Sequence, residues 1–101
     1  MILYNVTVSV DPGVEKDWLR WMQEIHIPEV MATRKFVDHK IFRILNEVEG
    51  GRTYAIQYFA LDINDMDNYL RDYAPRLRQQ HAERYGEKAL SFRTLMEQVI
   101  Q

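Results

Sequence analysis

Apolar and polar side chains alternate over residues 2–10, so that one face of this stretch is apolar. Alternation with a period of two is typical of a strand that is buried on one side. The apolar set consists of Ile2, Tyr4, Val6, Val8 and Val10. Runs that are rich in β-branched and aromatic residues predict three further strands, over residues 35–45, 52–61 and 89–100.

Two other stretches repeat their apolar residues every three or four positions, which is typical of an amphipathic helix. The first apolar stripe comprises Val14, Trp18, Trp21 or Met22, and Ile25. The second comprises Ile63, Met66, Tyr69 or Leu70, and Tyr73, and it continues after Pro75 as Leu77, His81 and Tyr85. Two long helices are therefore predicted between the strands.

Residues at the expected helix ends fit capping positions. Asp11 is predicted to cap the first helix, with Pro12 in its first turn. Asp62 is predicted to cap the second helix together with Asp65, three residues later. Gly86 is predicted to end the second helix, because glycine adopts positive φ angles without strain.

Each expected helix contains one proline, which lacks the N–H group of a helical hydrogen bond. Pro28 is predicted to end the first helix near His26 and to open a short second piece that ends near Thr33. Pro75 is predicted to divide the second helix in the same way. The two breaks would open the space through which a ligand could enter.

The order strand, helix, strand, strand, helix, strand predicts an α+β, ferredoxin-like βαββαβ fold in a single domain over residues 1–101. Four antiparallel strands would form one sheet, with both proline-broken helices on one face. A turn over residues 46–51 would join the second and third strands, because Gly50 and Gly51 suit a hairpin.

The second face of the sheet is apolar as well. In the third strand, Ala55, Phe59 and Leu61 alternate with Ile56 and Tyr58. Two helices cover only one face, and soluble proteins rarely leave an apolar face exposed. The sequence therefore predicts a homodimer in which two copies pack their open sheet faces together. The alternative is a monomer with an exposed apolar patch.

Charge and composition exclude several partners. The formal net charge of −2 argues against nucleic acid as the main partner. The absence of cysteine excludes disulfides, a thiol nucleophile and a thiolate metal site. No stretch is long and apolar enough to span a membrane, and the alternating first residues are unlike a signal peptide, so the cytoplasm is the expected compartment.

Several runs of the sequence carry a family resemblance. They are Tyr-Asn-Val-Thr at 4–7, Trp-Leu-Arg-Trp-Met at 18–22, His-Ile-Pro-Glu-Val-Met-Ala-Thr at 26–33, Gln-Tyr at 57–58, Ala-Pro-Arg-Leu-Arg-Gln-Gln-His at 74–81 and Phe-Arg-Thr at 92–94. On these runs, which extend over nearly the whole chain, the protein resembles the domain-of-unknown-function family 4286 of the dimeric α/β-barrel superfamily. The resemblance implies a dimer with a pocket between helices and sheet, but no established activity.

The wider superfamily includes small monooxygenases, isomerases and haem-degrading enzymes. Haem-degrading members use an asparagine of the first strand that points at the helices, and a tryptophan of a later strand. Asn5 is expected to point away from the helices, and the expected strands contain no tryptophan. His81 alone matches a histidine that such enzymes can have, so no haem or other cofactor is predicted.

Tyrosine and histidine side chains are predicted to converge between the helices and the sheet. A buried phenol needs a hydrogen-bond partner, and histidine can move a proton near neutral pH. At least one histidine is therefore predicted within hydrogen-bonding reach of Tyr4, Tyr54 or Tyr58. The six residues predicted to bind a small, flat or phenolic molecule are Tyr4, Trp21, His26, Tyr54, Tyr58 and His81. The alternative is a core in which these side chains satisfy one another.

The charged residues suggest no metal site. Pro28 separates His26 from Glu29, which makes a regular helical pair of ligands improbable, and no metal is predicted. The arginines of the second helix are interleaved with acids and are predicted to form a solvated face; they are Arg71, Arg76, Arg78 and Arg84. The alternative for them is an anion-binding rim near Pro75.

Two classes of function stay open. One is a small-molecule-binding protein or a cofactor-independent monooxygenase or isomerase. The other is a non-catalytic structural or interaction dimer. No motif identifies a reaction, so the sequence leaves open whether the protein is an enzyme. A cavity lined by His26, Tyr58 and His81 would favour the first class, and a filled core would favour the second.

Overall fold

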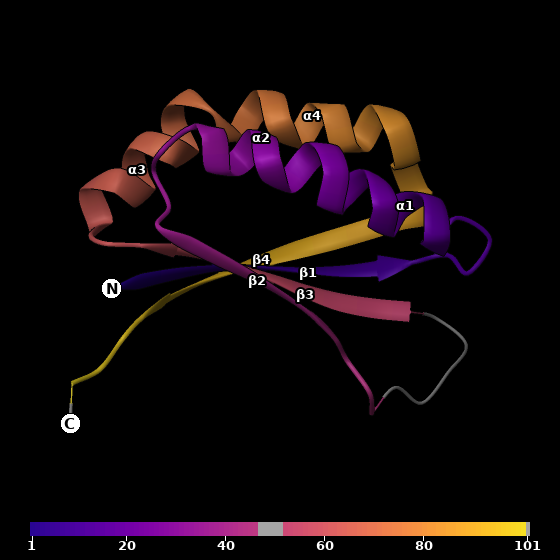
Figure 1. Ribbon diagram of the computed structural model, residues 1–101, viewed down its shortest axis with the longest axis horizontal. Coiled ribbons are helices and arrows are strands. Elements are labelled where there is room, and N and C mark those ends of the chain that lie inside the picture. Colours follow the sequence, from indigo (N-terminus) through magenta and orange to yellow (C-terminus); the bar gives the residue numbers. More distant parts are fainter. Residues whose placement is uncertain (47–51, 101) are drawn as a thin grey trace.

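The computed structural model describes residues 1–46 and 52–100 as a layer of helices over a four-stranded antiparallel sheet (Figure 1). The elements are β1 (Ile2–Val10), α1 (Glu15–Trp21), a π-helical turn (Met22–His26), α2 (Ile27–Ala32), β2 (Asp38–Arg43), β3 (Arg52–Ala60), α3 (Ile63–Asp72), α4 (Ala74–Tyr85), a 3₁₀ turn (Gly86–Lys88) and β4 (Ala89–Glu97). The predicted α+β, ferredoxin-like fold is confirmed.

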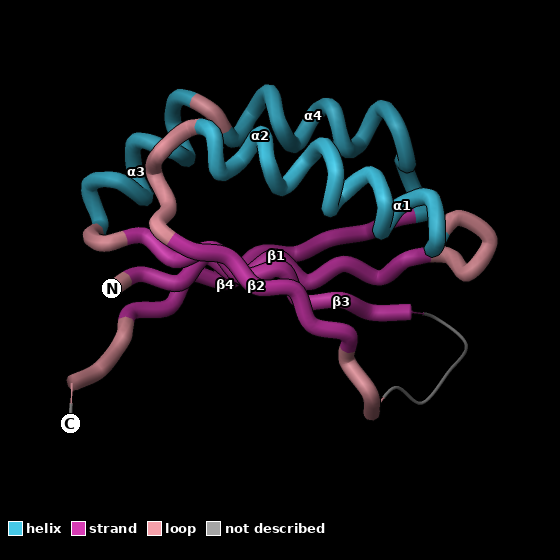
Figure 2. The backbone as a smooth tube through the Cα atoms, viewed as in Figure 1, coloured by secondary structure: helices cyan, strands magenta, loops and turns pink. Residues whose placement is uncertain are grey.

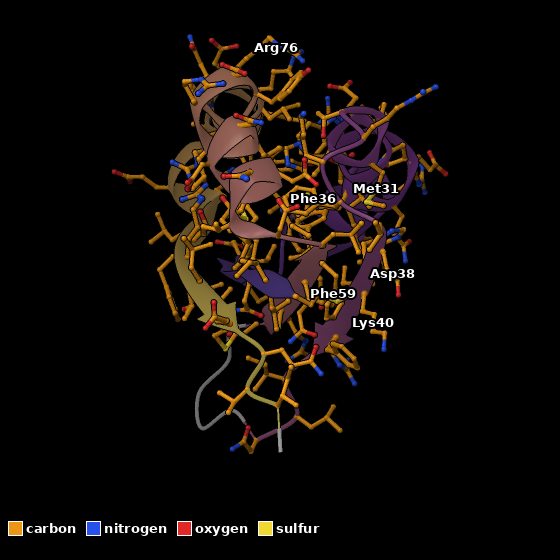
Figure 3. All side chains as sticks on the ribbon, turned by 90° about the vertical axis from the view of Figure 1, so that its left-hand side faces the viewer. Met31, Phe36, Asp38, Lys40, Phe59 and Arg76 are labelled. Atoms are coloured by element: carbon orange, nitrogen blue, oxygen red, sulfur yellow. The ribbon has the colours of Figure 1, made fainter. Side chains whose placement is uncertain are left out.

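The strands lie in the order β2-β3-β1-β4, and all helices lie on one side of the sheet (Figure 2). Because β1 pairs with both β3 and β4, residues of these two strands lie directly beside residues of β1. Tyr4 lies opposite Tyr58 of β3, and Val6 lies opposite Arg93 of β4. Figure 3 shows α3 and α4 above the β4 side of the sheet, and α1 and α2 above the β2 side.

The core lies between the helices and the sheet. The predicted alternation of β1 is confirmed, since Ile2, Tyr4, Val8 and Val10 are buried and Val6 is half-buried. Burying one large apolar side chain contributes about 1.5–3 kcal/mol to stability. The largest fully buried side chains from helices and strands are Trp18, Ile56, Met66, Leu77, Val8, Val10 and Val30.

The capping predictions are confirmed for the second helix and wrong for the first. Asp62 caps α3 by accepting a hydrogen bond from the Asp65 N–H at 2.9 Å, and Gly86 ends α4 with a φ of +53°, so both predictions are confirmed. The prediction for Asp11 is wrong, because α1 begins after Val14. The Asp11 carboxylate instead accepts the Gly13 N–H at 2.7 Å and closes the preceding turn.

The two prolines also act differently. Pro75 lies in the first turn of α4, after Tyr73 leaves helical geometry with a φ of −124°, so the predicted division of the second helix is confirmed. The prediction for Pro28 is confirmed in part. A separate piece, α2, begins at Ile27 with Pro28 in its first turn and ends before Thr33, but the expected break is absent, because His26 and Ile27 keep helical dihedrals. A π-helical turn precedes Pro28, and the Ile27 N–H bonds to the Met22 carbonyl, five residues back. This wider turn accommodates the proline without interrupting the helix.

Three strands are shorter than predicted, β3 by a single residue because it ends at Ala60. The β2 strand spans Asp38–Arg43 rather than residues 35–45, after a turn in which Arg34 has a φ of +63°. The β4 strand ends at Glu97, opposite Ile2, and one more backbone bond follows, from the Gln98 N–H to the Met1 carbonyl at 2.9 Å. The turn predicted over residues 46–51 lies almost entirely outside the described residues.

The sheet face opposite the helices, here called the open face, carries exposed apolar side chains. Phe42 is 50% exposed, Leu90 61% and Phe92 64%. Figure 3 shows Phe59 and Lys40 on this side, with the Lys40 ammonium 5.7 Å from the centre of the Phe59 ring. Asn5 points to the open face as predicted, since it aligns with Gln57 and Thr94 and bonds to Thr7 at 2.9 Å. Among the described residues, no helix has the length and apolarity to cross a membrane.

Candidate functional site

A small pocket of about 30 Å³ lies between the helices and strands β1, β3 and β4. Its apolar walls come from Val6, Val8, Met22, Val30, Ile56 and Leu77. Its polar lining consists of Tyr4, His26, Tyr58, Tyr69, Arg78, His81, Ser91 and Arg93. This volume has room for about two water molecules, or for one small functional group of a ligand.

His81 of α4 is held in one tautomer by a tryptophan. Its Nε2 atom accepts a hydrogen bond from Nε1 of Trp18 at 3.0 Å. Since the accepting nitrogen carries no proton, the proton of the neutral ring lies on Nδ1. Burial lowers the pKa of His81, and the positive charge of Arg93 lowers it further, so the imidazole is neutral at pH 7.

His26 projects from the π-helical turn and lacks a partner for one nitrogen. Its ring stacks on Trp21, with the two ring centres 4.9 Å apart. Burial, then His81, then Arg93 lower its pKa to about 4, so this imidazole is neutral as well. Its Nδ1 atom is buried without a hydrogen-bond partner among the described residues. An orphaned buried polar atom typically costs about 1–3 kcal/mol, which makes this nitrogen a notable feature of the pocket.

Two guanidinium groups meet on the hydroxyl of Tyr4. Nη2 of Arg78 and Nε of Arg93 each donate a hydrogen bond to Tyr4 Oη at 3.0 Å. One arginine comes from α4 and the other from β4. Because both donors use the lone pairs of the phenol oxygen, the O–H of Tyr4 is left to bond to another acceptor.

Aromatic rings fill the space next to these polar groups. The Phe36 ring centre lies 4.8 Å from that of Tyr69, 5.2 Å from that of Tyr58 and 6.1 Å from that of Tyr4. Burial raises the pKa of Tyr58 and of Tyr69, so both phenols stay protonated. Figure 3 shows Phe36 between the helices and the sheet. The rings pack against one another and leave no slot for a flat molecule among them.

The predicted hydrogen bond between a histidine and a tyrosine is wrong for the described residues. His81 bonds to Trp18, and Tyr4 bonds to two arginines. Tyr54 donates to Glu15 at 2.6 Å, and burial together with this bond raises its pKa to about 12. The three tyrosines of the sheet share one face as expected. However, Tyr54 lies four residues along β3 from Tyr58, a separation of about 13 Å.

Four of the six predicted site residues line one pocket, namely Tyr4, His26, Tyr58 and His81. Trp21 stands behind His26 and lines a separate outer groove of about 390 Å³ with Ile25, Glu29, Gln80, Glu83 and Arg84. Tyr54 lines neither of these spaces.

Four further residues line the pocket but were not predicted as site residues, namely Tyr69, Arg78, Ser91 and Arg93. A signal existed for two of them. Arg78 lies three residues before His81 on the inner stripe of α4, and Arg93 alternates with Phe92 on β4 and so faces the helices.

The other charged residues of the second helix behave as a mixed solvated surface. Arg71 pairs with Asp72 at 2.8 Å, and Arg84 pairs with Asp17 at 3.6 Å. Figure 3 shows Arg76 at the outer surface of the helix layer. Arg78 departs from this pattern, because it turns inward to Tyr4. Within the described ranges, no three acidic or histidine side chains are grouped closely enough to hold a metal ion.

Solved structures similar to this chain share its fold. An ethyl tert-butyl ether d (EthD) family protein from Bacillus halodurans C-125 has 15% identity and a TM-score of 0.69, with 98% of this chain and 100% of that chain covered. HapK from Hahella chejuensis has 12% identity and a TM-score of 0.72, with 98% and 93% covered. A dimeric ferredoxin-like protein from an uncultured marine organism has 14% identity and a TM-score of 0.64, with 99% and 96% covered.

At these identities the likeness establishes the ferredoxin-like fold alone. A comparison with curated proteins gives no match. The model of one family, DUF4286, a domain of unknown function, matches residues 1–99. The family expected from the sequence runs is therefore confirmed.

Proposed function

The chain belongs to the DUF4286 family, a domain of unknown function, and we propose that the protein is a homodimer that binds a small molecule in the pocket between helices and sheet. The observation that carries the proposal is the buried, partnerless Nδ1 atom of His26. A core kept only for stability pairs its buried polar groups. A ligand that bonds to this nitrogen would offset the cost of leaving it orphaned.

The surroundings of His26 support binding at this place. The pocket combines apolar walls with a few convergent polar groups, which is the usual composition of a small-molecule site. Its volume of about 30 Å³ suits one small polar group of the ligand. The ring of any aromatic ligand would therefore lie at the mouth of the pocket, rather than between Phe36 and the tyrosines.

The electrostatics favour binding over acid–base catalysis. A general base works best when its pKa lies near the operating pH. The pKa of His26 is lowered to about 4, and burial lowers that of His81 too. The Nε2 atom of His81 already accepts a hydrogen bond from Trp18. Neither imidazole is therefore ready to transfer a proton in the pocket.

The dimer is proposed from the open face. Phe42, Leu90 and Phe92 are each at least half exposed on it, and a second copy of the same face would bury them. The likeness to a structure described as a dimeric ferredoxin-like protein supports this arrangement. In the proposed dimer both pockets stay accessible, because the helices lie on the side of the sheet away from the interface.

Thermal denaturation with a panel of small acids, phenols, amides and amines tests the binding proposal. At least one compound should raise the melting temperature of the wild-type protein. The Ser91→Met variant, which fills the pocket from β4, should lose this response. The Ala82→Leu variant, at an exposed position of α4, should keep it. If no compound acts on the wild type, or if both variants respond alike, the pocket is not a binding site and the structural-dimer alternative is favoured.

A further inference from the structure

The strongest unexplained feature of the pocket is its uncompensated positive charge. Arg78 and Arg93 converge on one neutral phenol oxygen, each at 3.0 Å. The ion pairs among the described residues use Arg52, Arg71 and Arg84, and none of them involves these two arginines. Like charges that share one neutral oxygen repel each other, and an anion bound between them would relieve this repulsion.

We propose that the pocket receives the carboxylate group of a small organic acid, held between Arg78, Arg93 and the O–H group of Tyr4. This inference rests on the proposed binding function and specifies its ligand class. A carboxylate is an acceptor-only group with two oxygens, and a guanidinium keeps several N–H donors after one of them is used. Each arginine therefore has further N–H donors that can bond to an acid while it still bonds to Tyr4.

The field inside the pocket has the sign that an acid requires. After burial, the positive charge of Arg93 is among the causes that lower the pKa of both His26 and His81. No carboxylate of the described residues lines the pocket. A bound carboxylate would meet two cations and neutral rings, and no negative side chain would repel it.

Size selects a carboxylate rather than a larger oxyanion. The volume of about 30 Å³ matches about two waters, and a carboxylate replaces these with its two oxygens. A phosphate group brings four oxygens and exceeds this space. The planar form of a carboxylate also fits the planar fork of a guanidinium, which is why arginine is common at such sites.

The position of the arginines fixes the direction of entry. Arg78 and Arg93 are exposed residues of α4 and of the edge strand β4. Their guanidinium groups lie where the pocket approaches solvent, and His26 and His81 also line it. The carboxylate would enter from the α4–β4 side, and the remainder of the acid would stay outside between these two elements.

An NMR titration of the ¹⁵N-labelled protein at constant ionic strength tests the ligand class. The probes are acetate and benzoate, the neutral amides acetamide and benzamide, and inorganic phosphate. We expect each acid to bind at least about tenfold more tightly than its amide, because charge-assisted hydrogen bonds are stronger than neutral ones. We expect phosphate to bind more weakly than acetate.

Three variants assign the binding to the two arginines. Arg78→Gln and Arg93→Gln should each weaken acid binding by about tenfold or more, without changing amide binding. Arg76→Gln removes the same charge from the outer surface of α4 and should leave acid binding unchanged. Arg93→Lys keeps the charge but loses the fork, and it should bind acids with intermediate affinity.

The outcomes separate this inference from the binding proposal. If amides bind as tightly as acids, the pocket binds small molecules but is no carboxylate site. If phosphate binds best, or if Arg76→Gln weakens acids as much as Arg78→Gln, the carboxylate assignment is overturned. If neither acids nor amides bind to the wild type, and the compound panel also gives no response, both the inference and the proposed function fail.

Discussion

The two faces of the sheet differ most clearly along β3, where neighbouring residues lie in opposite environments. Ile56 and Tyr58 are covered by helices and are 0% and 2% exposed, whereas Ala55, Gln57 and Phe59 on the open face are only half-buried. Both faces are apolar enough to form a core. The difference arises because the chain provides helices for one face only.

Each face is incomplete in its own way. The helix-covered face has its apolar side chains buried, but among the described residues it leaves the Nδ1 atom of His26 without a hydrogen-bond partner and two arginines without an acidic partner. The open face has few unpaired polar groups of this kind, but it leaves Phe42 and Phe92 in solvent. A polar ligand would complete the first face, and an apolar partner surface would complete the second.

The largest expected difference between the faces is in stability. Ile56→Ala should lower the free energy of unfolding by about 2–5 kcal/mol, because it removes fully buried atoms and leaves a cavity. Phe42→Ala on the open face should cost less than about 1 kcal/mol in dilute protein, where the side chain is half exposed. Urea denaturation at low protein concentration measures both values. Equal losses would show that the open face is already packed within one chain.

The second expected effect concerns assembly. The wild-type protein should sediment as a dimer at micromolar concentration, and Phe59→Asp should raise the dimer dissociation constant at least about 100-fold, because it buries an unpaired charge. Ala82→Asp adds the same charge to an exposed position of α4 and should leave the dimer intact.

Phe92→Asp is a second variant for this test, because Phe92 is 64% exposed and its replacement leaves the protomer core untouched. It should also sediment as a folded monomer, with the circular dichroism spectrum of the wild type. A wild-type monomer at micromolar concentration would refute the dimer, and a dimer that tolerates both aspartates would place the interface elsewhere.

The third expected effect separates the faces by pH, because the helix-covered face encloses His26. The folded-state pKa of about 4 lies below the unfolded value of 6.5, so the unfolded chain binds a proton first as the pH falls. His26 therefore has no effect on stability above about pH 6.5, and its contribution becomes unfavourable between pH 6.5 and 4. The expected loss is up to about 3 kcal/mol.

A comparison with His26→Gln isolates this loss, because the acids that titrate in the same range are common to both proteins. The charged or titratable groups around His26 are His81 and Arg78 of α4, Arg93 of β4, Tyr4 of β1, Tyr58 of β3 and Tyr69 of α3. Urea denaturation between pH 4 and 8 should show a steeper decline for the wild type. Parallel curves would mean that His26 accepts a proton in the folded protein.

The fold could be predicted from the sequence because its signals are local and periodic. Alternation with a period of two gave β1 and assigned each of its residues to a face. The Asp62 cap and the Pro75 division follow from single residues with fixed preferences. The continuous helical backbone at Pro28 was not predicted, because a proline can either break a helix or follow a wider, π-helical turn. The sequence pattern does not distinguish these two cases.

The site was predicted less completely, because it depends on strand register. Arg93 of β4 faces the helices because it is aligned with Val6 of β1. This alignment depends on how the strands pair and not on the local sequence. Tyr4 of β1 and His81 of α4 were correctly predicted to face the space between helices and sheet, but the pattern did not give the distances from their side chains to possible partners. For this reason the sequence identified the pocket's aromatic and imidazole lining, and it assigned the wrong partners to Tyr4 and His81.

The smallest expected effect compares neighbouring residues at the end of β3. Tyr54 lies under the helices and donates to Glu15 of α1 at 2.6 Å, whereas Thr53 faces the open side. Tyr54→Phe should lower the free energy of unfolding by about 1 kcal/mol, because one hydrogen bond is lost while the ring stays in place. Thr53→Val should have a smaller effect, since β-branching is kept and the side chain is only half-buried.

A double-mutant cycle with Glu15→Ala assigns the loss to the bond itself. Arg52 also approaches Glu15, at 3.5 Å, so Glu15→Ala alone should cost more than Tyr54→Phe alone. If the bond between Tyr54 and Glu15 carries the effect, Tyr54→Phe should cost almost nothing in the Glu15→Ala background. A full loss in that background would instead show that the Tyr54 hydroxyl acts independently of Glu15, because Tyr54→Phe leaves the ring and its contact with Trp18, 5.1 Å between ring centres, in place.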